Sequence, residues 1–229
     1  MNYRKHFIPL ESDPSIFTDL MHKLGVSTSY AFLDVWSLED TIDIPRPVLA
    51  LLLILPSCPE YEKSLVTHKD CDASNKEVIW MKQTINNACG LYGILHAVCN
   101  TPGIIDDGSV LHRLIQPASS DRNAFLEDSK EVEELYQEAA LVGRSEAPPA
   151  ESEVDHHYLC FVKSSGHLYE LDGDQEGPID RGSLLEEDPL LEAGIQAMRN
   201  YVNSKTDGAF ALLALVKRRS LCFWLIVCV

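Results

Sequence analysis

The sequence lacks an apolar run long enough to cross a membrane. Its longest apolar runs span 48–55 and 221–229, whereas a membrane helix needs about 20 consecutive apolar residues. The first residues also contain no apolar core of a signal peptide. We therefore expect no membrane partner.

Basic residues are scarce. The 229 residues include 19 Lys and Arg against 35 Asp and Glu, which gives a formal net charge of −16. Nucleic acids bind to positively charged surfaces, so nucleic acid is not an expected partner. An acidic surface instead favours a basic protein or peptide, although the same charge can serve solubility alone.

The seven cysteines include no Cys-x-x-Cys pair, and their number is odd. This pattern favours neither a disulfide framework nor a zinc site. We expect the cysteines to be reduced and the protein to be cytoplasmic, with the nucleus as a second location.

The hydrophobic pattern predicts an α+β domain with a mostly antiparallel sheet. Apolar residues recur at helical spacing over 14–24, 87–99 (with Asn86 or Asn87 as the cap), 121–142 and 184–202. Strands are predicted at 31–35, 48–55, 157–162, 167–172 and 209–216. Every residue of 48–55 is apolar, which is typical of a strand with helices on both faces. Segment 60–77 is polar and is expected to be mobile, and 143–153 is expected to be an exposed loop.

Cys89 is the first candidate nucleophile. It is predicted to lie in the first turn of a helix, where unpaired backbone N–H groups and the helix dipole favour a thiolate. Gly90 and Gly93 follow, and their bare backbone would let a ligand approach closely. A free cysteine is more often a small core residue, and this alternative fits Cys99 and Cys160 better.

A catalytic thiolate needs a base, and the base needs an orienting group. His156 and His157 begin one predicted strand, and Asp172 ends the next. A two-residue turn between the strands would place His157 on the face of Asp172, whereas a three-residue turn would select His156. Glu170 and Asp174 share that face, so the spacing leaves the identity of the acid open.

Gln83 precedes Cys89 by six residues, in the segment that enters the predicted helix. Its amide could donate a hydrogen bond to an oxyanion, together with the backbone N–H of Cys89. By itself, a polar residue at this place is more often an exposed loop residue.

Five segments of the chain resemble the ubiquitin carboxyl-terminal hydrolases, which are papain-like cysteine peptidases. They occur in the family's order within about residues 7–216, and they are 8–14, 45–48, 82–97 (the nucleophile segment), 154–158 (the histidine segment) and 166–173 (the aspartate segment). The chain departs from the family at Leu91, where Thr is usual, and in the tail 221–229, which has no family counterpart.

The resemblance implies a papain-like cysteine peptidase fold, in which a central, mostly antiparallel sheet is packed between helices. It implies one catalytic domain over 1–220, with the apolar tail 221–229 outside the family pattern. It also implies that the loop around 143–153 crosses over the active site and limits what can be threaded through it.

The resemblance also assigns the catalytic roles. It implies that Cys89 is the nucleophile, Gln83 the oxyanion donor, His157 the general base and proton donor, and Asp172 the acid that orients the histidine. It implies no metal and no organic cofactor.

The activity that the resemblance implies is thiol-dependent hydrolysis of small adducts or short peptides from the C-terminal glycine of ubiquitin. We expect a monomer whose partner is ubiquitin or a ubiquitin-like modifier. Hydrolysis at a ubiquitin-like modifier is the alternative among enzymes. An inactive ubiquitin-binding module is the alternative of another class, and the four filled catalytic positions disfavour it.

Overall fold

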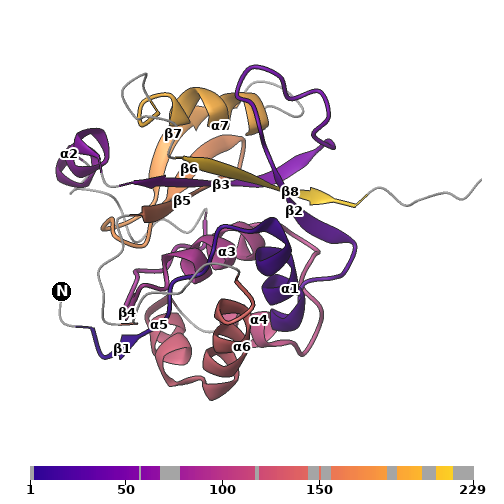
Figure 1. The fold of residues 1–229 in the computed structure, drawn as a ribbon, viewed down its shortest axis with the longest axis vertical. Coiled ribbons are helices and arrows are strands. Elements are labelled where there is room, and N and C mark those ends of the chain that lie inside the picture. Colours follow the sequence, from indigo (N-terminus) through magenta and orange to yellow (C-terminus); the bar gives the residue numbers. More distant parts are fainter. Residues whose placement is uncertain are drawn as a thin grey trace, which may run out of the picture.

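A six-stranded sheet forms the centre of the molecule (Figure 1). The computed structural model describes residues 3–56, 58–67, 78–116, 119–143, 150, 156–184, 190–202 and 210–218. The strand order is β2-β8-β3-β5-β6-β7, and every neighbouring pair is antiparallel. The strands are β2 (Tyr30–Asp34), β3 (Val48–Pro56), β5 (His156–Ser164), β6 (His167–Leu171), β7 (Ile179–Ser183) and β8 (Ala211–Lys217). The predicted α+β fold with a mostly antiparallel sheet is confirmed.

Helices cover both faces of this sheet (Figure 1). One face carries α7 (Leu190–Met198). The other carries α1 (Pro14–Leu24) and α3 (Cys89–Cys99), with α4 (Val110–Ile115), α5 (Ser119–Asp128) and α6 (Lys130–Ala140) on the same side. A further helix, α2 (Pro59–Thr67), follows β3, and the short strands β1 (Lys5–His6) and β4 (Ile85–Asn86) pair in parallel. No helix in the described ranges has the length and apolar character needed to span a bilayer.

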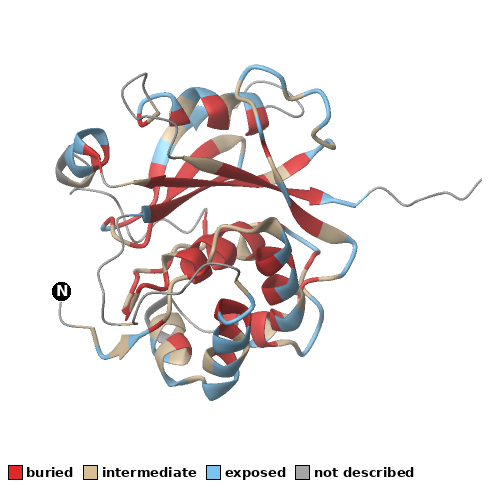
Figure 2. Ribbon diagram, in the orientation of Figure 1, coloured by how far each residue is buried: buried red, intermediate tan, exposed pale blue. Residues whose placement is uncertain are grey.

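The central strand β3 divides the core into two layers. Ala50, Leu52 and Ile54 belong to the cluster under α1 and α3, whereas Leu51 and Leu53 belong to the cluster under α7. Residues 50–55 of the strand are all buried (Figure 2). The prediction that 48–55 is a strand covered on both faces is therefore confirmed, because alternate side chains meet different helices.

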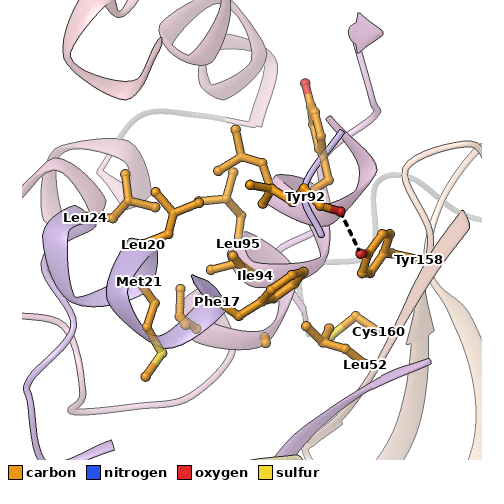
Figure 3. Packing of buried hydrophobic residues seen from close by; sticks show 14 of the residues in the cluster. Phe17, Leu20, Met21, Leu24, Leu52, Tyr92, Ile94, Leu95, Tyr158 and Cys160 are labelled. Atoms are coloured by element: carbon orange, nitrogen blue, oxygen red, sulfur yellow. Dashed lines mark hydrogen bonds between the residues drawn. The ribbon is translucent and has the colours of Figure 1, made fainter. Parts of the chain in front are cut away.

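The larger layer packs aromatic and aliphatic side chains from α1, α3 and the sheet against one another (Figure 3). Phe17 stacks on Tyr158 with ring centroids 5.6 Å apart, and Leu52 lies in the same cluster. Helix α3 packs directly on β5 in the same layer, and this packing fixes the two elements that carry Cys89 and His157.

The first helix forms as its sequence predicts. Asp13 caps α1 by accepting a hydrogen bond from the Ser15 N–H, and Pro14 occupies the first helical turn. Gly25 ends the helix in the left-handed conformation with φ of 113°.

The prediction of a mobile polar segment at 60–77 is wrong in its first part, which forms α2. Pro59 begins the helix and two glutamates lie in its first turn, a favourable arrangement at a helix N-terminus. Tyr61 and Ser64, three residues apart, are buried on one face. Residues 68–77 lie outside the described residues.

Two other predicted helices have different bounds. The helix expected over 121–142 is divided into α5 and α6 by Ser129, whose hydroxyl accepts the Val132 N–H and so caps a new helix. The helix expected over 184–202 is limited to α7, and the preceding strand β7 and the short helix α4 were not predicted. Of the expected crossover loop only Gly143 and Ala150 are described, and the tail 221–229 is not among the described residues.

Candidate active site

The turn between β5 and β6 decides which histidine faces the acid. Ser164 pairs with His167, so the turn contains two residues, Ser165 and Gly166, with φ of 47° and 78°. This confirms the two-residue turn. His156 is exposed, whereas His157 is 9% exposed and directed toward the segment after β6.

His157 and Asp172 form a buried pair. Nε2 of His157 lies 2.6 Å from Oδ1 of Asp172, whose side chain is fully buried. The carboxylate also accepts the backbone N–H of Asp174 at 2.8 Å, and the indole of Trp80 donates to the Asp172 carbonyl at 2.8 Å. These contacts hold Nε2 of the imidazole on the acid, so Nδ1 lies on the opposite side of the ring.

The two other candidate acids have different surroundings. Glu170 is buried but pairs with Arg181 at 2.8 Å and accepts the Tyr201 hydroxyl at 2.7 Å. Asp174 lies on the other side of the imidazole, with Oδ2 3.6 Å from Nδ1 of His157. Of the three carboxylates that sequence spacing left open, the structure therefore brings Asp172 into hydrogen-bond contact with the histidine.

The electrostatics of the pair favour the charged form of both partners. Burial opposes a charge on His157, but the Asp172 carboxylate outweighs it and raises the pKa of His157 well above its ordinary value. Burial likewise opposes a charge on Asp172, and the nearby imidazolium lowers the pKa of that carboxyl. The pair can thus hold a proton on the imidazole at neutral pH.

Cys89 is the first residue of α3, as the sequence predicts for a nucleophile. It is half-buried, and its thiol lies close enough to His157 to contribute to the raised pKa of that imidazole. Because Nε2 of His157 is engaged by Asp172, Nδ1 is the nitrogen available to the sulfur. The structure therefore brings Cys89, His157 and Asp172 into one site.

The predicted helix cap is wrong. Ala88 precedes α3 and offers no side-chain cap, while Asn86 lies in β4. Asn87 adopts the left-handed conformation with φ of 58°, and its Nδ2 donates to the Ala150 carbonyl at 2.8 Å. Its amide is therefore directed at the end of the predicted crossover segment instead of at the helix.

Gly90 and Gly93 were expected to leave the backbone near the sulfur open to a ligand, but they do not. A Cβ on Gly90 would lie 3.3 Å from Leu10, and a Cβ on Gly93 would lie 3.4 Å from Leu52. Both glycines face the core, where they let α3 pack closely against its neighbours. The expectation that they admit a ligand is wrong.

Gln83 is buried against the segment that carries the acid. It is 6% exposed, and its backbone N–H donates to the Gly173 carbonyl at 2.8 Å. Its side-chain Oε1 is buried without a hydrogen-bond partner among the described residues. The alternative that Gln83 is an exposed polar loop residue is therefore excluded. Oε1 can only accept a hydrogen bond, so the atom of Gln83 that could donate to an oxyanion is Nε2.

Sequence reasoning missed three side chains that surround the pair. Tyr61 from α2 donates to Asp172, Trp80 holds its backbone, and Lys82 donates to the carbonyls of Asp174 and Gln175 at 3.0 and 2.8 Å. The burial of Tyr61 could have been read from its three-residue spacing to Ser64. The other two carry no signal in the local sequence.

The remaining described cysteines fit the core alternative. Cys58 and Cys160 are buried, and burial raises the pKa of the Cys99 thiol to about 12. Within the described ranges, ligand atoms with spacing suited to a metal ion occur at His157, Asp172 and Asp174. Asp172 already shares its oxygens with three donors, so hydrogen bonding accounts for this group.

Comparison with known proteins gives consistent matches over nearly the whole chain. The sequence profile of the ubiquitin carboxyl-terminal hydrolases, family 1, matches residues 7–203. The chain is 33% identical to ubiquitin carboxyl-terminal hydrolase YUH1 of Saccharomyces cerevisiae, over 91% of this chain and 94% of that protein. It is also 33% identical to ubiquitin carboxyl-terminal hydrolase 3 of Arabidopsis thaliana, over 93% and 95%.

The fold is similar to that of a solved structure. The catalytic domain of Trichinella spiralis UCH37, crystallised bound to ubiquitin vinyl methyl ester, superimposes with a TM-score of 0.75 at 20% identity. The match covers 96% of this chain and 97% of that one.

Proposed function

The chain belongs to family 1 of the ubiquitin carboxyl-terminal hydrolases, and we propose that it cleaves small adducts and short peptides from the C-terminal glycine of ubiquitin. It is a cysteine-type deubiquitinase, a thiol protease of the ubiquitin conjugation pathway. The observation that supports the proposal most directly is the position of His157, which contacts the Asp172 carboxylate through Nε2 and lies close enough to Cys89 for the thiol to influence its pKa.

The first half of the proposed reaction forms a thioester. The Cys89 sulfur attacks the carbonyl carbon of the terminal glycine, and the carbonyl oxygen becomes an oxyanion. The Cys89 N–H at the start of α3 and the Gln83 amide stabilise that charge. His157 then gives its proton to the leaving amine, alcohol or thiol as the bond to the glycine breaks.

The second half hydrolyses the thioester. His157, now neutral, takes a proton from water while the water oxygen attacks the same carbonyl carbon. The carbon–sulfur bond breaks, the sulfur leaves as a thiolate, and ubiquitin departs with a free carboxylate. Asp172 keeps the imidazole in one orientation through both halves.

The proposed preference for small leaving groups is supported by the place where the predicted crossover segment meets the site. The Ala150 carbonyl accepts the Asn87 amide at 2.8 Å, and Asn87 is two residues from Cys89. A segment anchored there would pass a thin peptide tail more readily than a folded protein. The net charge of −16 also suits the basic tail of ubiquitin.

Titration with ubiquitin vinyl methyl ester tests the proposal. Cys89 should form one covalent adduct per chain, detected as a mass increase and mapped to that residue. Cys89→Ala should form no adduct and still bind ubiquitin, because affinity comes from the wider surface. Cys99→Ala is the matched control and should react like the unmodified chain.

Two outcomes would contradict the proposal. Binding of ubiquitin without any adduct would identify an inactive ubiquitin-binding module. Faster hydrolysis of a fluorogenic ubiquitin-like modifier than of fluorogenic ubiquitin would show that the preferred modifier is different.

A further inference from the structure

Tyr61 contacts both members of the His157–Asp172 pair, although it exchanges no proton in the proposed reaction. Its side chain is 4% exposed, and its hydroxyl donates to Oδ2 of Asp172 at 3.1 Å. Its ring stacks on the imidazole of His157, with centroids 5.0 Å apart and 27° between the planes. One side chain therefore restrains the carboxylate and the imidazole together.

The two oxygens of Asp172 have separate partners. Oδ1 accepts from Nε2 of His157 at 2.6 Å and from the Asp174 N–H at 2.8 Å, whereas Oδ2 accepts from Tyr61. The Asp172 side chain is fully buried, so loss of the phenol would remove a donor where solvent does not replace it, which is costly. The hydroxyl consequently fixes the rotation of the carboxylate and the oxygen that faces His157.

The helix that carries Tyr61 is itself anchored to the acid segment. Ser64 lies almost one turn further along α2, and its hydroxyl accepts a hydrogen bond from Gln175 Nε2 at 3.1 Å. Helix α2 thus contacts the segment around Asp172 at two points, which makes it a rigid support for the phenol.

We propose that Tyr61 is a positioning residue of this active site, whose hydroxyl fixes Asp172 and whose ring fixes the plane of His157. Nδ1 of His157 is thereby kept directed at Cys89. A stacked ring prevents the imidazole from tilting, and a fixed carboxylate prevents it from rotating. Small losses of alignment between reacting groups lower rates strongly.

The first experiment separates the hydroxyl from the ring. In Tyr61→Phe the stack remains and the donor is lost, so kcat on a fluorogenic ubiquitin adduct should fall about tenfold, with KM unchanged. In Tyr61→Leu the stack is lost as well, and kcat should fall about 100-fold. KM should not change because the Tyr61 side chain is buried and offers almost no surface to a substrate.

The matched control is Tyr201→Phe. Tyr201 is a buried tyrosine whose hydroxyl also donates to a buried carboxylate, that of Glu170 at 2.7 Å. Within the part of the chain that the structure describes, it contacts Glu170, Arg181 and Ser64, and neither His157 nor Asp172. Its loss should lower thermal stability to a similar degree as Tyr61→Phe and leave kcat within about twofold.

The kinetic test of this inference rests on the proposed function, since it needs hydrolase activity. A second measurement, by NMR, does not depend on turnover. A proton in a short hydrogen bond between imidazole and a buried carboxylate gives an NMR signal at unusually low field. The His157 Nε2 proton should show this signal in the unmodified chain and in Tyr201→Phe. In Tyr61→Phe it should move upfield or broaden through faster exchange.

A double-mutant cycle with Asp172→Asn completes the test. If the hydroxyl acts through the carboxylate, Tyr61→Phe should change kcat less than twofold in the Asp172→Asn background. The proposal is overturned by an unchanged low-field signal with unchanged kcat, by an effect on KM alone, or by equal kcat losses in Tyr61→Phe and Tyr201→Phe. A chain without hydrolase activity would contradict the proposed function, and the NMR comparison would still decide the role of Tyr61.

Discussion

Gly173 lies so close to Gln83 that no side chain fits between them. The Gln83 N–H donates to the Gly173 carbonyl at 2.8 Å, and a Cβ on Gly173 would approach the Gln83 Cβ to 2.7 Å. Real Cβ contacts are not this short, so any larger residue must displace Gln83. This contact joins the segment of the proposed oxyanion donor to the segment of the proposed acid.

We expect Gly173→Ala to lower kcat between about 10-fold and 100-fold through displacement of Gln83. Gln83→Ala removes one oxyanion donor and should lower kcat about 100-fold with KM little changed. The double variant should be hardly slower than Gln83→Ala alone, because the alanine at 173 then has no donor to displace. Additive losses in steady-state kinetics would show that Gly173 acts in another way.

We expect His157→Ala to lower kcat about 1000-fold or more, and His156→Ala to leave it within about twofold. His157 contacts Asp172 at 2.6 Å, whereas its neighbour is exposed. The two variants make the same substitution at neighbouring positions of β5, so each is the control for the other. Equal losses, or a larger loss in His156→Ala, would contradict the assignment of the base.

We expect Asn87→Gly to raise the rate on ubiquitin–ubiquitin dimers relative to the rate on small adducts. Glycine accepts the φ of 58° but cannot donate to the Ala150 carbonyl. Ser165→Gly is the control, since it also places glycine at a position with positive φ, here 47°. Ser165 follows the end of β5 that is remote from His157. If the ratio of the dimer rate to the small-adduct rate is unchanged in Asn87→Gly, the contact between Asn87 and Ala150 does not limit the size of the substrate.

We expect His96 to make the fold sensitive to mild acid. Its ring is buried beside Met81, and burial lowers the pKa of His96 from 6.5 to about 4. The unfolded chain therefore binds this proton at higher pH than the folded chain. The unfolding free energy should fall by up to about 3 kcal/mol as the pH drops from 6.5 to 4.

The control for this prediction is His96→Gln, which can keep hydrogen bonds to Met81 but does not titrate. Titratable groups that do not interact with His96 behave alike in both chains, so the difference between the two stability curves reports on His96. Denaturant unfolding at several pH values measures it. Parallel curves between pH 4 and 6.5 would show that His96 is not the source of the acid sensitivity.

The sequence by itself determined the elements whose pattern is local. Continuous apolar residues predicted β3, caps and spacing predicted α1, and the order of the motifs indicated the family and the α+β fold. Strand alternation made the choice between His157 and His156 depend on the length of the β5–β6 turn, and the structure shows the two-residue turn that places His157 toward the acid.

Tertiary structure alone decided the choices that depend on distant partners. Strand spacing left Asp172, Glu170 and Asp174 open and the family resemblance named Asp172, but only the packed structure gives the physical reason, because Arg181 engages Glu170 while His157 contacts Asp172. Tyr61 reaches Asp172 across 111 residues, and its helix looked like an unstructured polar segment. The two glycines of α3 were expected to face a ligand and instead face the core. Periodicity shows that a face exists, but only the packed neighbours determine what that face meets.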